Sequence, residues 1–486
     1  MISMLLAITT LVGCKKFLEV EPKGKAVATD YEHFNGLLNN PYLGGFQYLK
    51  FTATSNAETG FIGYSFSILG SVDAPFLMSD DIEANSDFFK NYTLIQKNQY
   101  RWADNVYLPD DNSAEWGTMY ALNYIYNLVA NGVMTANGGT ETQKRKVRAE
   151  ARVNRAHMHF WAAQLFAPPY EEGTSATALG IPIVTEASTE ASNFTRSSLK
   201  DTYDFIINEI TAAIPDLDDV TYNRNRVSKS AAYYMLGETY FYMHQYTKAL
   251  DAFQKAVQFL AQSKINIGLY NYNTKVNDWF VPFMSNMGLV NHPNPFDNEE
   301  NIYAKQCIAP VNSAFGSQTV LRSTVYELFD SNDQRRKIFS NRGLFSSAQI
   351  LPGYQRSGPL TVNYGPSLPN LLLMKAECEA RLGDLQNAEK DLLSLRKNRM
   401  PDAAATVVYA NQQGLVKTIL TERMREFAAT GLRWLDMRRL FDDPLYNNLN
   451  LTRTIEGKTY TLTRDRLCLR IPPSVLNYNP GMSDNK

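Results

Sequence analysis

The clearest hydrophobic pattern in the chain predicts two antiparallel helices between Ser228 and Val257. The positions that match the spacings of a tetratricopeptide repeat are Tyr233, Leu236, Gly237, Tyr240, Ala249, Phe253 and Ala256. The small residues allow two helices to approach closely, while the large ones fill the groove between them. Because one such pair cannot bury its own apolar face, we expect stacked neighbours elsewhere in the chain.

Two further segments carry related patterns. Residues 369–399 repeat the order of small and large positions around a Gly383-Asp384 turn. Residues 143–214 contain two more amphipathic stretches, separated by a long Pro- and Gly-bearing loop at 167–195. The predicted helix pairs therefore span about 143–214, 228–258 and 369–399. Long insertions in a repeat scaffold usually carry function, so we expect a mainly α fold whose irregular insertions build the ligand face.

Other patterns fill in the rest of the chain. Residues 112–133 read as a helix on which Trp116, Tyr120, Tyr124 and Leu128 form one apolar face, expected in the core. Residues 416–441 read as strongly helical and unusually charged. We expect residues 44–108 and 265–306 to be irregular. The proline-rich tail from Arg470 onward is expected to be non-helical.

The amino terminus predicts a processed leader. Met4 to Gly13 is apolar but too short to span a bilayer, and it ends in Leu11-Val12-Gly13-Cys14, which resembles a bacterial lipoprotein box. We expect residues 1–13 to be a signal peptide, 14–29 a tether lipidated on Cys14, and 30–486 a single domain. The alternative is an ordinary apolar helix that contains a cysteine. No Lys or Arg precedes the apolar run, so the true translation start is expected upstream of Met1.

Charge and motifs exclude several classes of function. The formal net charge is -1, which gives no basic field to attract nucleic acid. The three remaining cysteines show neither a disulfide framework nor zinc spacing, and the 5 histidines make a histidine metal site improbable. No phosphate loop, dinucleotide fingerprint or hydrolase elbow is present. We therefore predict a protein that is not an enzyme and needs no cofactor or metal.

Two acidic groups of residues remain open to more than one interpretation. Asp81-Ile82-Glu83-Ala84-Asn85 begins like a calcium loop, but the glycine and the glutamate that such a loop needs are missing, which favours a turn or a polar ligand contact. The alternating charges between Glu422 and Arg439 could bind an acidic ligand. The favoured interpretation is that they pair with one another and lock the last helices to the repeat core.

The residues that fit ligand binding are aromatic rings beside polar side chains. Sugars present apolar C–H faces and hydroxyl groups, so a site for them needs flat rings flanked by amide, carboxylate and guanidinium groups. The segment from Tyr100 to Asn105 supplies this mixture, with Trp102 as the main stacking candidate and core packing as its alternative. The complete set of candidate binding residues is Trp102, Tyr100, Arg101, Asp104, Asn105, Asp81, Asn85, Trp279 and Phe296. His292 and Asn294 are weaker candidates beside Phe296.

Several separated segments together resemble one family, the SusD/RagB outer-membrane nutrient-binding lipoproteins. They include the Cys14-Lys15-Lys16-Phe17-Leu18-Glu19 start, the Ala149-Glu150-Ala151-Arg152 helix, and Glu299-Glu300-Asn301-Ile302. Further segments are Asp333 with Arg335, Glu422-Arg423 with Glu426, Gly431-Leu432-Arg433-Trp434, and Ile471-Pro472 with Asn479-Pro480. The segments cover nearly the whole chain in the family's order.

The resemblance implies a lipid-anchored protein on the outer face of a Gram-negative outer membrane. It implies capture of an oligosaccharide and delivery into a TonB-dependent β-barrel transporter of the SusC type. Peptide capture on the same scaffold is an alternative, and a tetratricopeptide adaptor for protein tails is a second. A surface glycosidase using Asp80 and Asp81 is a third, although the sequence does not fix the carboxylate separation that such chemistry needs.

Overall fold

The computed structural model describes residues 28–40, 48–55, 62–69, 72–84, 86–188, 190, 192–279, 291–308, 319–342, 350–356, 358, 361–446 and 449–485. Its α-helices are α1 (Tyr31–Leu38), α2 (Ala74–Met78), α3 (Ser86–Phe89), α4 (Leu94–Tyr100), α5 (Ala114–Gly132), α6 (Glu141–Phe166), α7 (Leu199–Ala213), α8 (Lys229–Tyr242), α9 (Tyr246–Leu260), α10 (Tyr272–Lys275), α11 (Ser323–Tyr326), α12 (Leu368–Leu382), α13 (Leu385–Lys397), α14 (Gln412–Glu426), α15 (Leu432–Leu440) and α16 (Pro473–Tyr478). Its strands are β1 (Tyr48–Ser55), β2 (Ile62–Leu69), β3 (Ile82–Ala84), β4 (Gln306–Ile308), β5 (Thr319–Leu321), β6 (Phe339–Arg342), β7 (Ile350–Arg356), β8 (Thr361–Asn363), β9 (Thr452–Ile455) and β10 (Lys458–Thr461).

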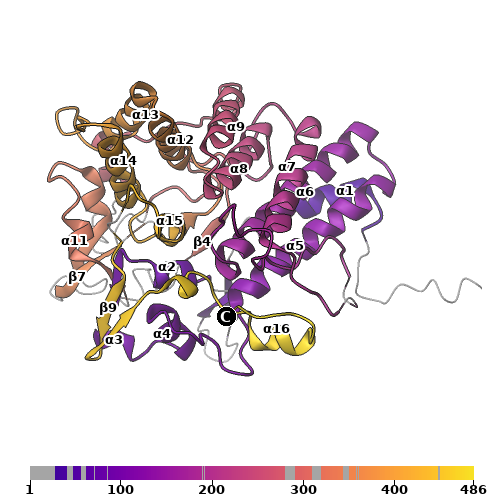
Figure 1. The fold of residues 1–486 in the computed structure, drawn as a ribbon. Coiled ribbons are helices and arrows are strands. Elements are labelled where there is room, and N and C mark those ends of the chain that lie inside the picture. Colours follow the sequence, from indigo (N-terminus) through magenta and orange to yellow (C-terminus); the bar gives the residue numbers. More distant parts are fainter. Residues whose placement is uncertain are drawn as a thin grey trace, which may run out of the picture.

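The long helices stand side by side in an arc across the molecule (Figure 1). The pairs α12–α13, α8–α9 and α6–α7 follow one another along this arc, with α14 at one end and α5 at the other. Short strands and short helices occupy the region below the arc. The predicted mainly α fold with tetratricopeptide-type helix pairs is therefore confirmed.

The α8–α9 pair shows why its sequence pattern predicts the fold. The Ser228 hydroxyl accepts a hydrogen bond from the Ala231 N–H and caps the start of α8. Gly237 faces Phe253 so closely that a Cβ at this glycine would lie 2.6 Å from the Phe253 ring. Ala249 and Ala256 are completely buried on the opposing helix. Close approach of two helices thus depends on small residues at these positions.

The other two pairs have well-defined ends. Thr140 and Gln143 form a capping box at the start of α6, two residues before the predicted start. Gly383 ends α12 with a φ of 92°, a left-handed conformation that glycine adopts without strain. Lys375, which occupies a position normally held by leucine in this repeat, contacts Glu379 and Asp391 and so avoids burying an unpaired charge.

Two sequence expectations about local structure, for residues 44–108 and for the tail, were wrong. Residues 44–108 include α2, α3, α4 and β3, and β1 pairs antiparallel with β2. The strongly helical reading of 416–441 is confirmed by α14 and α15, which are separated where Ala429 and Gly431 have φ values of 52° and 86°. The tail forms the short helix α16, since Pro473 stands in its first turn, where a missing N–H costs nothing.

The β structure forms several small sheets. One contains four strands in the order β3-β5-β7-β6, and the others are the pairs β1-β2, β9-β10 and β4-β8. The β4–β8 pair joins residues 306–308 to residues 361–363. This pairing fixes two distant loops beside the first turn of α12.

Buried ion pairs hold the carboxyl-terminal helices in place. Arg335 is almost fully buried and donates to Asp333 at 2.7 Å and to Glu426 at 2.8 Å. Its other carboxylate partner is Glu422, which also pairs with Arg396 at 2.6 Å. These partners come from α13, α14 and the segment at 333–338, so the predicted locking role of the charges is confirmed for this region.

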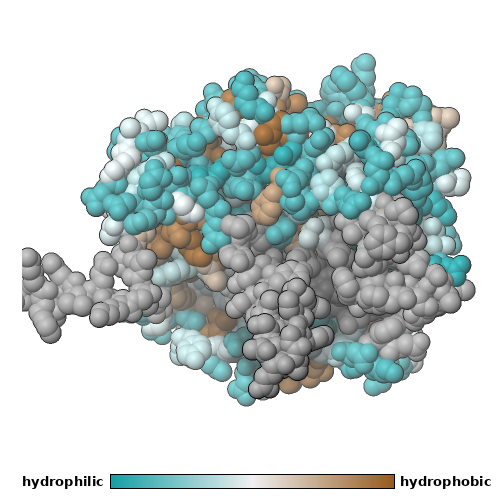
Figure 2. Space-filling view, turned by 180° about the vertical axis from the view of Figure 1, so that it is seen from behind, coloured by the Kyte–Doolittle hydropathy of each residue, from teal (hydrophilic) through white to brown (hydrophobic). Residues whose placement is uncertain are grey.

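The surface of the helical part is mostly hydrophilic on the face shown in Figure 2, with small separate hydrophobic areas. Among the described residues, no helix combines the length and the apolar character that crossing a bilayer requires.

Candidate functional site

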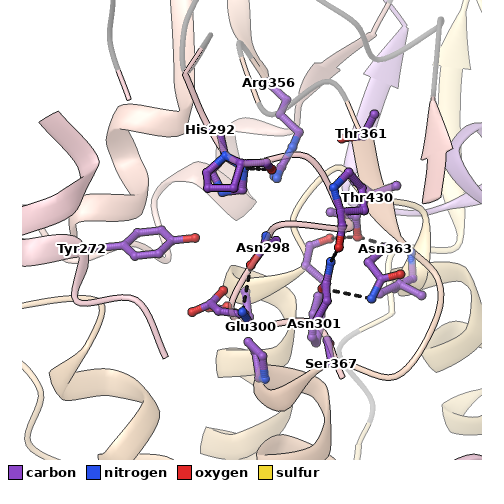
Figure 3. A pocket seen from close by; sticks show the side chains of 17 residues that line it. Tyr272, His292, Asn298, Glu300, Asn301, Arg356, Thr361, Asn363, Ser367 and Thr430 are labelled. Atoms are coloured by element: carbon purple, nitrogen blue, oxygen red, sulfur yellow. Dashed lines mark hydrogen bonds between the residues drawn. The ribbon is translucent and has the colours of Figure 1, made fainter. Parts of the chain in front are cut away.

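A polar cavity opens where several irregular segments meet the ends of α12 and α14 (Figure 3). We call it the amide cavity, and its volume is about 100 Å³. It lies between the loop at 292–301, α10, the end of β7, β8 and the turn that joins α14 to α15. The polar residues that line it are Tyr272, His292, Asn298, Glu300, Asn301, Arg356, Thr361, Asn363, Ser367, Glu426 and Thr430.

Two asparagines, Asn301 and Asn363, build the frame of this cavity. Asn301 donates from its side chain to the Pro295 carbonyl at 2.8 Å and accepts a hydrogen bond from Asn363 at 2.9 Å. The Asn363 side-chain oxygen accepts from the Lys305 N–H at 2.7 Å. These bonds tie the 292–301 loop to β8. The frame is therefore held by the protein before any ligand arrives.

Tyr272, Asn298 and Arg356 each supply a polar group to the cavity. The Tyr272 hydroxyl points toward the centre of the cavity (Figure 3) and has no hydrogen-bond partner among the described residues. The side-chain oxygen of Asn298 accepts a hydrogen bond from the Glu300 N–H at 2.9 Å. The side-chain NH2 group of Asn298 has no hydrogen-bond partner among the described residues. Arg356 enters the cavity from the end of β7. Together these groups offer two neutral donors and one cationic donor.

Aromatic rings form one wall of the cavity. The Trp279 ring packs edge-on against His292 at 4.7 Å and against Tyr272 at 5.1 Å between ring centroids. Tyr272 and His292 line the cavity, while Trp279 lies behind them and is 5% exposed. Burial lowers the pKa of His292 to about 4, so this ring is neutral at physiological pH. The wall thus combines apolar ring surface with neutral polar edges.

The carboxylates beside the cavity are already paired. Glu300 accepts from Arg399 at 2.8 Å and from the Tyr270 N–H at 2.9 Å. Glu426 accepts from Arg399 at 2.7 Å and from Arg335 at 2.8 Å. Burial raises the pKa of the Glu300 carboxyl, and the Arg399 guanidinium opposes that rise. Neither carboxylate has the free lone pairs or the isolation that a catalytic acid or base needs.

The structure places the predicted segment at 100–105 away from this cavity. Trp102 is 3% exposed, its indole N–H donates to the Met78 carbonyl at 2.9 Å, and Arg453 stacks over the ring at 4.0 Å. No face of the ring remains for a ligand, so core packing, the alternative left open by the sequence, describes this residue. Tyr100 is also buried, and its hydroxyl accepts from the Ala84 N–H at 3.0 Å.

The polar residues of the same segment lie nearer the surface. Arg101 pairs with Glu456 at 2.6 Å, and Asp104 pairs with Arg470 at 3.3 Å. Asn105 is exposed. None of these three side chains lines the amide cavity.

Asp81 has a structural position. It is fully buried, accepts a hydrogen bond from the Ala429 N–H at 2.7 Å, and does not line the cavity. Burial raises the pKa of this carboxyl to about 6. Asn85 and Cys14 lie outside the described residues.

Of the predicted binding residues that the structure describes, Trp279, Phe296 and the weaker candidate His292 lie at or near the amide cavity, and His292 lines it. Trp279 supports its aromatic wall, and Phe296 belongs to the 292–301 loop without lining the cavity itself. The cavity residues that were not predicted from the sequence are Tyr272, Asn298, Arg356 and Asn363. The density of asparagine and proline at 292–301 was the available signal. No pattern in the sequence indicated that Arg356 of β7 and Asn363 of β8 would line this cavity.

A second cavity, of about 290 Å³, lies between α5 and the tail. We call it the aromatic cavity, and its aromatic residues are Trp116, Tyr120, Tyr124, Phe194 and Tyr478. The α5 face that was expected in the core is only partly buried, because Trp116, Tyr120 and Tyr124 line this cavity. The Tyr120 hydroxyl donates to the Pro182 carbonyl at 2.9 Å.

Comparison with protein families gives three matches. Residues 73–241 match a SusD-like family described as "Starch-binding associating with outer membrane", and residues 368–486 match the SusD family. Residues 230–260 match the tetratricopeptide repeat, which coincides with α8 and α9. No curated protein sequence matched the chain significantly.

Solved structures share the fold over nearly the entire chain. A SusD superfamily protein from Bacteroides thetaiotaomicron is 18% identical with a TM-score of 0.69, covering 94% of this chain and 100% of its own. Surface glycan-binding protein A from Bacteroides uniformis is 16% identical with a TM-score of 0.68, covering 93% and 99%. A SusD-like carbohydrate binding protein from Bacteroides vulgatus is 16% identical with a TM-score of 0.64, covering 93% and 97%. With SusD family models matching both its amino-terminal and carboxyl-terminal parts, this chain belongs to the SusD/RagB family.

Proposed function

We propose that the protein binds an oligosaccharide in the amide cavity and does not alter it chemically. The observation that carries this proposal is the set of unpaired donors at Tyr272 and Asn298 beside an aromatic wall, in a frame fixed by Asn301 and Asn363. Sugar hydroxyls need such donors, and sugar C–H faces pack on rings. The family description and the names of the glycan-binding structural neighbours support the same class of ligand.

The proposal also gives the protein a cellular location and a partner protein. The protein would be anchored to the outer leaflet of an outer membrane through acyl chains on Cys14 and would pass its ligand to a TonB-dependent transporter of the SusC type. Support comes from the lipoprotein-like sequence ending at Cys14 and from the family's association with the outer membrane. A delivery protein must also release its ligand, which favours a small site with few hydrogen bonds over tight binding.

Calorimetric titration of the purified full-length protein in detergent tests ligand binding. Plant, host and microbial oligosaccharides are compared with mixed peptides. The Asn298→Ala and Tyr272→Phe variants each remove one available donor. Each is expected to weaken saccharide binding about three- to tenfold, the effect of one net hydrogen bond. The control is Asn105→Ala, because Asn105 is exposed and lies outside the cavity.

Each outcome of this titration discriminates between functions. Saccharide binding that Asn298→Ala weakens and Asn105→Ala does not supports the amide cavity as the site. Peptide binding without saccharide binding would transfer the proposal to peptide capture on the same scaffold. Cleavage of a bound glycan would favour the surface glycosidase, and its loss in an Asp81→Asn variant would be required to assign that activity to Asp81.

A further inference from the structure

Arg356 gives the amide cavity an unpaired positive charge. Its Nη1 donates to the Ala428 carbonyl at 3.2 Å, and its buried Nε has no hydrogen-bond partner among the described residues. No carboxylate of the described chain lies within ion-pair distance of this guanidinium. Figure 3 shows the side chain descending between His292 and Thr430 toward the cavity. Arg356 is partly exposed, so its charge, which is costly to remove fully from water, remains accessible from the cavity.

The acidic residues nearest to the cavity do not neutralise it. Glu300 and Glu426 belong to a network in which every carboxylate contacts at least one guanidinium. The carboxylates of this network are Asp333, Glu422, Glu426 and Glu300. The guanidinium groups are those of Arg335, Arg396, Arg425 and Arg399. Because the two sets balance, the network leaves the charge of Arg356 uncompensated.

Two other titratable groups near Arg356 leave this conclusion unchanged. His292 is neutral, as shown above. Asp81 binds the Ala429 N–H, next to the carbonyl that Arg356 contacts, but it is fully buried and does not line the cavity. Burial is the main reason why the pKa of Arg356 is lowered to about 10, with Tyr272, Glu426 and Asp81 offsetting only part of that effect. Arg356 therefore stays charged at pH 7.

The sequence around the cavity provides no additional acid. Residues 280–290, 309–318, 343–349 and 357–360 adjoin the cavity-lining segments along the chain. None of them contains Asp or Glu; they are made of apolar, amide, hydroxyl and glycine residues. Among the described residues and these four adjoining segments, Arg356 therefore has no acidic partner, and a ligand could supply one.

We propose that the amide cavity selects an anionic saccharide and that Arg356 binds its carboxylate or sulfate group, with Asn298 and Tyr272 donating to neighbouring hydroxyls. This inference rests on the proposed function and specifies its ligand class. A guanidinium offers several N–H donors in a planar fork that matches a carboxylate or sulfate. Neutral sugars would fill the same cavity without neutralising Arg356.

The experiment compares charged saccharides with neutral saccharides of the same ring and linkage. The full-length protein is titrated with oligogalacturonides and with the same oligomers after reduction of their carboxyl groups to alcohols. A second arm uses sulfated oligosaccharides and their desulfated forms. The two arms distinguish a carboxylate from a sulfate as the anion. Charged ligands are expected to bind about ten- to hundredfold more tightly than their neutral counterparts, the effect of a charge-assisted hydrogen bond.

Variants assign this preference to Arg356. Arg356→Gln should remove the preference while keeping a donor for the Ala428 carbonyl, and Arg356→Lys should retain part of it. The control Arg101→Gln removes a half-buried surface cation that lies outside the cavity, and it should leave the preference unchanged. Circular dichroism and melting temperature establish that each variant is folded.

The outcomes separate this inference from the proposed function. Equal binding of charged and neutral forms, or a preference that persists in a folded Arg356→Gln variant, overturns the anionic class and leaves saccharide capture standing. Binding of acidic peptides with no binding of any saccharide overturns both. A preference that raised salt weakens and Arg356→Gln removes supports the inference.

Discussion

Arg433 and Asp80 form a buried, doubly hydrogen-bonded ion pair across 353 residues of sequence. The Nε–Oδ1 distance is 2.6 Å, the Nη2–Oδ2 distance is 3.0 Å, and both side chains are almost completely buried. Asp80 also accepts from the Asn450 N–H at 3.0 Å. One carboxylate thus connects the segment before β3 to α15 and to the loop that leads into β9.

Removing one member of this pair should destabilise the fold strongly. Arg433→Ala leaves the Asp80 carboxylate buried without its cation, so we expect a loss of about 3–5 kcal/mol in the free energy of unfolding. Urea denaturation measures it. Arg101→Ala, which breaks the partly exposed pair with Glu456, serves as the comparison and should cost about 1 kcal/mol or less. Similar losses in the two variants would contradict the interpretation.

Glu238 should make stability fall as pH rises. Burial raises the pKa of this carboxyl to about 8 from an unfolded value near 4.5, and Arg423 and Tyr234 only partly oppose the rise. The folded state therefore holds a proton that the unfolded chain releases between these two pH values. The contribution of Glu238 is fully present below pH 4.5 and is lost as pH rises through 8.

Glu238→Gln tests this dependence, because glutamine resembles the protonated acid. The variant should be more stable than the wild type at pH 8 by roughly 1–3 kcal/mol, with the difference shrinking toward pH 5. Urea denaturation at each pH provides the measurement. Glu456→Gln, the same substitution at an exposed residue, is the control. A pH-independent difference would show that Glu238 does not titrate in this window.

Two helical glycines should respond in opposite directions to alanine. In Gly237→Ala the new Cβ would meet the Phe253 ring at 2.6 Å and the Ala249 carbonyl at 3.2 Å, so packing strain of about 1–3 kcal/mol should outweigh the gain in helix propensity. In Gly117→Ala the new Cβ meets nothing within 4 Å, so the variant should gain up to about 1 kcal/mol. Thermal melting of both variants checks the sign. Stabilisation of both would mean that α8 and α9 are not in close contact.

Trp102 should matter for stability and not for ligand binding. Trp102→Phe removes the hydrogen bond to the Met78 carbonyl and reduces packing against Arg453, so we expect a loss of about 1–3 kcal/mol. Saccharide affinity, measured by calorimetry on the folded variant, should stay within about twofold, a difference smaller than one net hydrogen bond. A selective loss of affinity at unchanged stability would return the stacking role to this ring.

Cys14 should carry the membrane anchor. Metabolic labelling with a radioactive fatty acid in a Gram-negative host should label the wild-type protein and leave Cys14→Ala unlabelled. Several acyl chains bind a membrane stably, so the variant should move from the membrane fraction to the soluble fraction. Cys468→Ala is the matched cysteine control and should keep the label. Labelling of Cys14→Ala would refute this anchor.

Local patterns in the sequence determined the helical scaffold of this protein. The alternation of small and large residues from Tyr233 to Ala256 specifies two helices in close contact, since close packing depends on side-chain size at fixed helical spacing. Ser228, Thr140 and Gly383 mark helix ends because capping depends on one or two neighbouring residues. The sequence also predicted that the charges between Glu422 and Arg439 pair with one another, because so many alternating charges in helices need partners of opposite sign.

Tertiary structure alone decided where the candidate site lies. The amide cavity combines Tyr272 of α10, Asn298 of a loop, Arg356 of β7 and Asn363 of β8, and no local pattern relates these positions. Trp102 belongs to a segment with the composition of a sugar site, yet contacts with Met78 and Arg453 place its ring in the core. Composition specifies which interactions a side chain can make. Which partners it meets depends on contacts between residues far apart in the chain, and these exist only in the folded protein.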